Sequence, residues 1–163
     1  MRLINVSPAL EHDIDVIASL AEACALQGSI KKQPSGYRGF IESIVRNGAA
    51  PAKLGRAKCF VTRINKGRDI AGFSVLREID SRTLELWIVC VATGEQRKSY
   101  GESFVKHAMD YACAVSASLC ARCSSKSSQG MISLLEKLDF EEGQPDGSWH
   151  TFIYQPRFSE TFL

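Results

Sequence analysis

The middle of the chain has the hydrophobic pattern of β-strands. Short runs of alternating or continuous apolar residues occur at Cys59–Ile64, Ile70–Ile79 and Leu84–Val91. The segments between them, Asn65–Asp69 and Asp80–Ser81, are polar and short enough for tight turns. Strands joined by such turns pair with each other antiparallel. We therefore expect a three-stranded antiparallel meander here.

Four other segments repeat their apolar residues at the three- and four-residue spacing of amphipathic helices. The first follows a short alternating strand at Arg2–Val6, and Ser7–Pro8 is predicted to begin it as N-cap and first helical residue. Its apolar face comprises Ile14, Ile17, Leu20, Ala21 and Cys24. The other helices are predicted at Tyr37–Val45, at Tyr100–Ser116, and from Ser127 or Ser128 to Phe140.

Two more strands, Leu119–Ser124 and Trp149–Tyr154, complete the predicted order of elements. A meander combined with a strand–helix–strand crossover requires a mixed sheet, so the fold class is α+β (α/β). With 163 residues the chain is long enough for one domain with its own core. We expect that domain over residues 1–156 and a C-terminal tail at residues 157–163.

The composition excludes several classes of protein. Hydrophobic residues make up 45% and charged residues 23% of the chain, as in ordinary globular proteins. A net charge of +2 is too small for a surface that is basic throughout, so nucleic acid is not an expected partner. No apolar run reaches the roughly 18 residues of a membrane span, and no secretory leader is recognisable. We expect a cytoplasmic protein that does not bind a membrane.

The six cysteines lie mostly within apolar patterns and are expected to be reduced, buried thiols. Cys120 and Cys123 have the spacing of a metal-binding pair, but no second pair or nearby histidine completes a tetrahedral site. Residues three apart on a strand face opposite sides. No metal site is predicted.

The segment from Leu84 to Phe140 carries the candidate chemistry. The strand Leu84–Val91 is followed by a polar turn, Ala92–Gly101, and directly by a helix. The first N–H groups of a helix have no partner within it, and the helix dipole adds partial positive charge there. This order of elements predicts a phosphate-binding site made of main-chain groups.

Two motifs in this segment resemble those of the GNAT-type N-acetyltransferases. The family's pyrophosphate signature is Gln or Arg, two residues, Gly, one residue, then Gly or Ala. Here it reads Gln96–Gly101, with Ser99 in place of the middle glycine. The second motif is the helix that ends in Leu138–Phe140. There Leu135 replaces the tyrosine that often protonates the leaving thiolate, and Asp139 replaces a glycine.

The resemblance implies a GNAT-like, mostly antiparallel sheet that is splayed at its central strand, with acetyl-CoA as cosubstrate. Main-chain groups at the splayed strand would pair with the pantetheine arm, and N–H groups at the helix start would hold the pyrophosphate. Ser128 stands where an asparagine commonly contacts the pantetheine arm. The implied cofactor-binding residues are Val89, Cys90, Val91, Gln96, Arg97, Lys98, Ser99, Tyr100, Gly101, Glu102 and Ser128.

Glu85 is the candidate catalytic base. It stands six residues before Val91, as a glutamate does in the histone-acetyltransferase branch of the family. Strand alternation places Glu85 on one face with Trp87, Val89 and Val91, and apolar surroundings there would raise its pKa. The alternative is an exposed glutamate that pairs with Arg77 or Arg82 across the hairpin.

The resemblance implies transfer of acetyl to a primary amine by direct attack. The alternative function is a non-catalytic acyl-CoA-binding or protein-interaction module, in keeping with the departures at Ser99, Leu135 and Asp139. The sequence leaves the acceptor open between a small molecule and a protein lysine or N-terminus. It also leaves the oligomeric state open, a homodimer included.

Overall fold

A computed structural model describes residues 4–96, 98–124, 129–145 and 147–156. Its centre is a seven-stranded sheet in the order β1-β2-β3-β4-β5-β7-β6. Neighbouring strands are antiparallel except for β4 and β5, which are parallel. The strands are β1 (Val6–Pro8), β2 (Ala57–Ile64), β3 (Asp69–Asp80), β4 (Thr83–Val91), β5 (Ser118–Ser124), β6 (Glu141–Glu142) and β7 (Trp149–Tyr154). The predicted meander, now β2–β4, and the mixed α+β sheet are confirmed.

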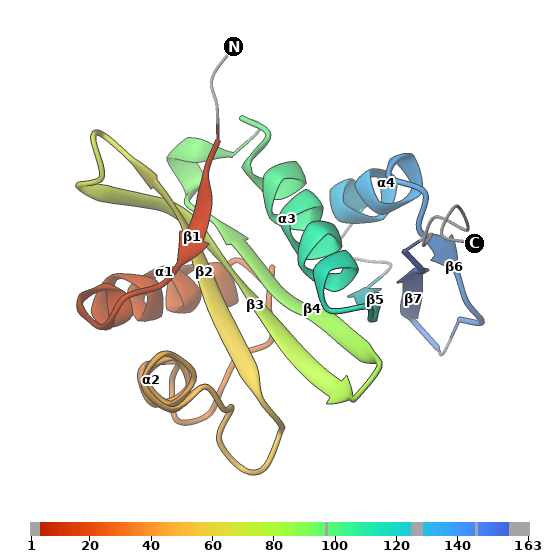
Figure 1. The fold of residues 1–163 in the computed structure, drawn as a ribbon. Coiled ribbons are helices and arrows are strands. Elements are labelled where there is room, and N and C mark those ends of the chain that lie inside the picture. Colours follow the sequence, from red (N-terminus) through yellow and green to blue (C-terminus); the bar gives the residue numbers. More distant parts are fainter. Residues whose placement is uncertain (1–3, 97, 125–128, 146, 157–163) are drawn as a thin grey trace.

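Helices cover both faces of the sheet (Figure 1). The α-helices are α1 (Ile14–Leu26), α2 (Arg38–Asn47), α3 (Tyr100–Ala114) and α4 (Gln129–Lys137), and the short 3-10 helices are η1 (Glu11–Asp13) and η2 (Thr93–Glu95). α1 and α2 pack on one face, where Ile17, Ile41 and Phe73 are fully buried. α3 and α4 pack on the other face, around Leu119 and Leu135. The predicted helical faces are therefore the ones that the sheet buries.

The start of the first helix was predicted wrongly. Ser7 and Pro8 do not cap a helix but lie in β1, where Pro8 is opposite Phe60 of β2. β1 is an edge strand, and a proline there sacrifices no ladder hydrogen bond on the open side. The first helical turn begins only at η1, where the Asp13 carboxylate accepts a hydrogen bond from the Leu10 N–H at 2.7 Å.

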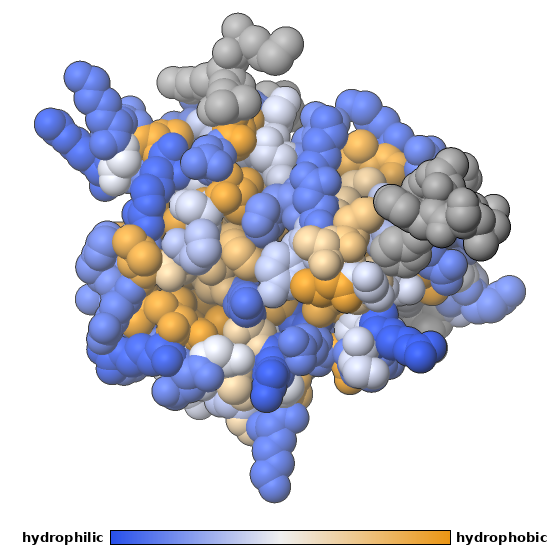
Figure 2. Space-filling view, viewed as in Figure 1, coloured by the Kyte–Doolittle hydropathy of each residue, from blue (hydrophilic) through white to orange (hydrophobic). Residues whose placement is uncertain are grey.

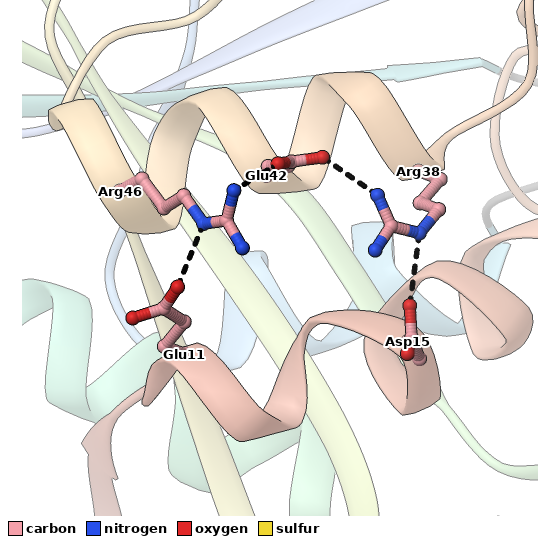
Figure 3. A network of polar contacts seen from close by, with 5 residues as sticks. All are labelled: Glu11, Asp15, Arg38, Glu42 and Arg46. Atoms are coloured by element: carbon pink, nitrogen blue, oxygen red, sulfur yellow. Dashed lines mark hydrogen bonds and ion pairs between the residues drawn. The ribbon is translucent and has the colours of Figure 1, made fainter.

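A network of exposed ion pairs joins η1 and α1 to α2 (Figure 3). Arg38 contacts Asp15 at 2.9 Å and Glu42 at 2.6 Å. Arg46 contacts Glu42 and lies 2.9 Å from Glu11. Each exposed pair contributes little alone, but Glu42 links the two arginines within α2, and each arginine makes one contact outside it, Arg38 to α1 and Arg46 to η1.

Among the described residues, no helix resembles a membrane span. None of the helices in the described part of the chain combines the length and the apolar character needed to cross a bilayer. Figure 2 shows hydrophilic side chains over most of the face in view, with smaller hydrophobic areas among them.

The predicted tail at residues 157–163 and the predicted N-cap at Ser127 or Ser128 lie outside the described residues.

Replacing Asp13 tests a buried ion pair between η1 and β2. Asp13 is 3% exposed, and Arg63 contacts its two oxygens at 2.9 and 2.6 Å. We expect Asp13→Asn to lower the free energy of unfolding by about 3 kcal/mol at pH 7, because it leaves a guanidinium without its partner. Asp15→Asn, at a carboxylate that is 78% exposed, is the control and should change it by less than about 0.5 kcal/mol.

The loss should also depend on pH. Burial opposes ionisation, but the hydrogen bonds from Arg63 and from the Leu10 N–H outweigh it and hold the pKa of Asp13 below its ordinary value. A carboxyl group with a lower pKa in the folded state contributes stability above its unfolded pKa and loses it as the pH falls. The difference between wild type and Asp13→Asn in urea unfolding should therefore shrink below about pH 4. A constant difference from pH 7 to about pH 2 would contradict this.

Gly72 lies where β3 passes close to β4. A Cβ atom at this position would lie 2.5 Å from the Cys90 carbonyl oxygen and 3.2 Å from the Phe104 ring. We expect Gly72→Ala to lower the free energy of unfolding by about 2 kcal/mol, because backbone must move to admit the methyl group. Gly39→Ala is the control, since open space surrounds Gly39 in α2 and alanine favours a helix. Equal stabilities of the two variants in chemical denaturation would disprove the close approach.

Candidate active site

β4 and β5 pair only at their beginnings. The paired residues are Thr83 with Ser118, Leu84 with Leu119 and Glu85 with Cys120. β4 nevertheless continues to Val91 along β3, and β5 continues along β7. From Leu86 onward, the side of β4 that faces β5 therefore has no strand partner among the described residues, as the expected splayed sheet requires. Unpaired main-chain donors and acceptors are left available along this edge.

A β-bulge lies where the two strands part. Val75 of β3 is opposite Ile88, and the next residue, Leu76, is opposite Leu86, so Trp87 is the extra residue of β4. An extra residue reverses the alternation of side chains beyond it. Trp87 and Ile88 accordingly both pack on the α1/α2 side, whereas Val89 packs on the α3 side.

The bulge corrects one expectation about Glu85. The neighbours of Glu85 in β4, Leu84 and Leu86, pack on the α3/α4 side, and Glu85 points to the other face. It shares that face with Trp87 but not with Val89 or Val91, which pack with α3 residues. Simple alternation failed because it assumes a regular strand.

A cleft of about 410 Å³ lies between the parted strands. Its walls come from both strands, from the end of α1 and the loop after it, and from the first turns of α3 and α4. The lining residues are Cys24, Ser29, Leu86, Val89, Cys90, Val91, Gln96, Gly101, Ala121, Arg122, Cys123, Gly130 and Met131. The cleft thus joins the free edge of β4 to the start of a helix.

The start of α3 has the predicted main-chain geometry. The first hydrogen bond of the helix runs from the Ser103 N–H to the Ser99 carbonyl at 3.1 Å. The N–H groups of Tyr100, Gly101 and Glu102 precede this bond and have no acceptor within the helix. Ser99 itself has φ +68°, a left-handed conformation that favours glycine, so the glycine of the family motif would suit this backbone position.

The charges around this turn are largely paired. Lys98 lies 3.1 Å from Glu95. Glu102 contacts Lys137 of α4 at 3.1 Å and Lys106 at 3.7 Å. The hydrogen bond from Lys137, together with the charges of the two lysines, lowers the pKa of Glu102. The carboxylate next to the predicted phosphate site is thereby neutralised by two cations.

Glu85 is buried beside one cation. Its side chain is 6% exposed, and Oε2 accepts a hydrogen bond from Arg77 at 2.8 Å. The Arg77 guanidinium also lies over the Trp87 ring, 4.1 Å from its centroid. The pair with Arg77 that the sequence left as an alternative is therefore present, but it is buried rather than exposed. No hydrogen bond or ion pair to the second oxygen of Glu85 is present among the described residues.

The family tyrosine has no polar substitute in the cleft. Leu135 is fully buried in the core between α4 and the sheet. Of the described residues that line the cleft, none is a tyrosine. Instead, the thiols of Cys24 and Cys90 hydrogen-bond to each other there, and this bond together with burial raises the pKa of Cys90. After the end of α4, Asp139 has φ +67°, a left-handed conformation that favours glycine.

The structure brings only part of the predicted site together in the cleft. Val89, Cys90, Val91, Gln96 and Gly101 line it, while Lys98, Ser99, Tyr100 and Glu102 lie on the adjoining turn and helix. Arg97 and Ser128 lie outside the described residues. The sequence did not point to the lining residues from α1 and β5, because no local pattern shows which distant segments border the cleft.

Comparisons with known proteins agree with this geometry. Residues 27–140 match the model of the acetyltransferase (GNAT) family. No curated protein matches the chain. Spermidine N-acetyltransferase from Vibrio cholerae, solved with CoA and spermine, is 14% identical with a TM-score of 0.69, over 92% of each chain. PaiA N-acetyltransferase from Thermoplasma acidophilum, solved with coenzyme A, is 15% identical with a TM-score of 0.66, over 95% of this chain and 100% of that one. N-acetylglutamate synthase from Neisseria gonorrhoeae, solved with coenzyme A and N-acetyl-glutamate, is 16% identical with a TM-score of 0.65, over 94% of this chain and 35% of that one.

The left-handed conformation at Ser99 predicts an unusual gain from glycine. We expect Ser99→Gly to raise the free energy of unfolding by about 0.5–1 kcal/mol, because it relieves the strain of a Cβ atom at positive φ. Ser133→Gly, the same substitution inside α4, should lower it by a similar amount. Urea denaturation of both variants gives the comparison, and a loss of stability in Ser99→Gly would contradict the assigned conformation.

Proposed function

This chain belongs to the GNAT acetyltransferase family, and from that premise we propose that it transfers acetyl from acetyl-CoA to an amine. The observation that carries the proposal is the free edge of β4 leading to the start of α3. An edge with unpaired main-chain groups suits an extended pantetheine arm, and a helix start suits a diphosphate. Both features border one cleft.

We propose specific roles for the residues of that cleft. Main-chain groups of Val89, Cys90 and Val91 bind the pantetheine arm, and N–H groups from Gln96 to Glu102 bind the pyrophosphate. Lys98 supplies positive charge there. Arg97 and Ser128, which lie outside the described residues, are proposed for the same ligand from the resemblance alone. Structures of two neighbours with CoA support the choice of cosubstrate.

The proposed reaction is a direct attack of a neutral amine on the thioester carbonyl. A C–N bond forms and the C–S bond breaks, while a main-chain N–H at the free edge of β4 stabilises the oxyanion. Glu85 accepts the proton that the amine loses, through the oxygen that Arg77 does not contact. The leaving thiolate takes a proton from water, because Leu135 offers none.

We propose a cytoplasmic location for this reaction. All six cysteines of the chain are free in the structure, and all except Cys113 are buried. Reduced thiols persist in the cytoplasm, whereas oxidising compartments favour disulfides.

Acetyl-CoA binding and turnover test the proposal separately. Calorimetric titration should show saturable binding of acetyl-CoA, and a thiol-release assay with a panel of amines should show turnover. Glu85→Gln should reduce kcat by about a hundredfold or more at pH 7.5 while leaving the affinity for acetyl-CoA unchanged. Glu78→Gln, at an exposed position of β3, is the matched control and should retain full activity.

Two outcomes would contradict parts of the proposal. No binding of acetyl-CoA would refute the function as a whole. Binding without turnover of any amine, in the wild type as well as in Glu85→Gln, would favour the non-catalytic acyl-CoA-binding module. A thermal melt of each variant controls for the lost charge partner of Arg77.

A further inference from the structure

We propose that the amine acceptor also carries a carboxylate, which the guanidinium group of Arg122 binds beside the cleft. The inference rests on the proposed function and goes further, because it names the chemical class of the acceptor. It comes from the charges on the sheet face that α1 and α2 cover only in part.

Strand register places the relevant residues in one row. Arg77 is opposite Glu85, Glu85 is opposite Cys120, and Cys120 is opposite Ile153 of β7. α1 packs on β3 and β4, and α2 packs on β2, so the helices cover the other half of this face (Figure 1). At β7 the face is open, since Ile153 is 37% exposed. The row therefore runs from beneath the helices to an open surface next to the cleft.

Arg122 stands at the open end of this surface. Its neighbours in β5, Ala121 and Cys123, pack on the α3/α4 side, so Arg122 points to the same face as Glu85. Its guanidinium lies over the Trp149 ring, 5.6 Å from the centroid, and the residue also lines the cleft. Among the described residues, no carboxylate pairs with Arg122. Stacking holds the guanidinium in place and leaves its N–H edge free for an anion.

Arg77 adds a second positive charge to this row. One of its terminal nitrogens donates to Glu85, but its buried Nε has no hydrogen-bond partner among the described residues. Like Arg122, it lies against a tryptophan ring. Both arginines are within electrostatic range of Cys120, which lies between them in the sheet, and both oppose the rise in its pKa caused by burial.

The charge balance of this surface favours an anionic group. Beside the cleft, among the described residues, the unpaired charge is Arg122, because Glu85 already has Arg77 as its partner and the exposed Glu141, opposite Ile153 in the same row, lies in β6, two strands beyond β5. A polyamine needs unpaired carboxylates, whereas a carboxylate ligand matches the planar donor edge of arginine. From strand spacing and rise, the backbone positions of Glu85 and Arg122 are about 8 Å apart. An amino acid or another small amine with a carboxylate spans that distance, with its amine at Glu85 and its carboxylate at Arg122.

Matched pairs of amines test the inference. Free amino acids and dipeptides are compared with their C-terminal amides, and with spermidine, in the thiol-release assay. We expect kcat/KM to be higher for the acids than for the amides or for spermidine. Arg122→Gln should raise the KM for the acids about ten- to a hundredfold, and Arg122→Lys should restore part of the loss. The KM for acetyl-CoA should not change, and Arg82→Gln, in the β3–β4 turn, should behave as wild type.

The outcomes separate this inference from the proposed function. If acetyl-CoA binds and the amides or spermidine react as well as the acids, the function stands and the carboxylate preference is refuted. The same holds if Arg122→Gln weakens acids and amides equally, or if none of the acids reacts. Failure of the wild type to bind acetyl-CoA overturns the proposed function, and the inference with it.

Discussion

The separation of β4 from β5 is the constraint on which the site depends. β4 pairs with β3 from Thr83 to Val91, interrupted at the bulge, but shares only three residue pairs with β5. Buried main-chain groups without partners are costly, so an edge of this kind is stable only next to water or a ligand that pairs with it. The fold thus keeps a strand edge without a strand partner at the centre of its sheet, among the residues that the structure describes.

Because of the bulge at Trp87, the parts of β4 before and after it present their side chains to different faces of the sheet. Before it, Glu85 faces the α1/α2 side; after it, Val89 turns toward α3. The carboxylate and the cleft-lining residues are therefore presented in different directions by one strand. In the proposed reaction, the amine approaches the thioester from the face opposite to the one that α3 covers.

The departures from the family motifs fall into two physical kinds. Ser99 and Asp139 both lie in left-handed conformations that suit glycine, so their side chains are accommodated at some cost in strain. Leu135 removes a polar group and completes the core around α4. Only the replacement of the tyrosine by Leu135 changes the chemistry that is available. In the proposed mechanism, Glu85 and water therefore carry out the proton transfers.

The charged groups near the site also fall into two kinds, those with a charged partner and those without one. Most of the acidic side chains near the site are paired, as Glu102 is with Lys137 and Glu85 with Arg77. Arg122 differs because an aromatic ring rather than a carboxylate holds it. A net charge of +2 gave no hint of this local imbalance, since it sums over pairs that cancel.

The amino-acid sequence by itself determined the elements and their order. The meander, the buried face of α1 and the turn before α3 were all predictable, because hydrophobic periodicity and helix starts are local properties. The tertiary structure alone decided that Pro8 joins β1, that Trp87 is bulged and that Arg122 meets Trp149. These depend on the register between strands and on contacts between segments far apart in the chain, and no local pattern encodes either.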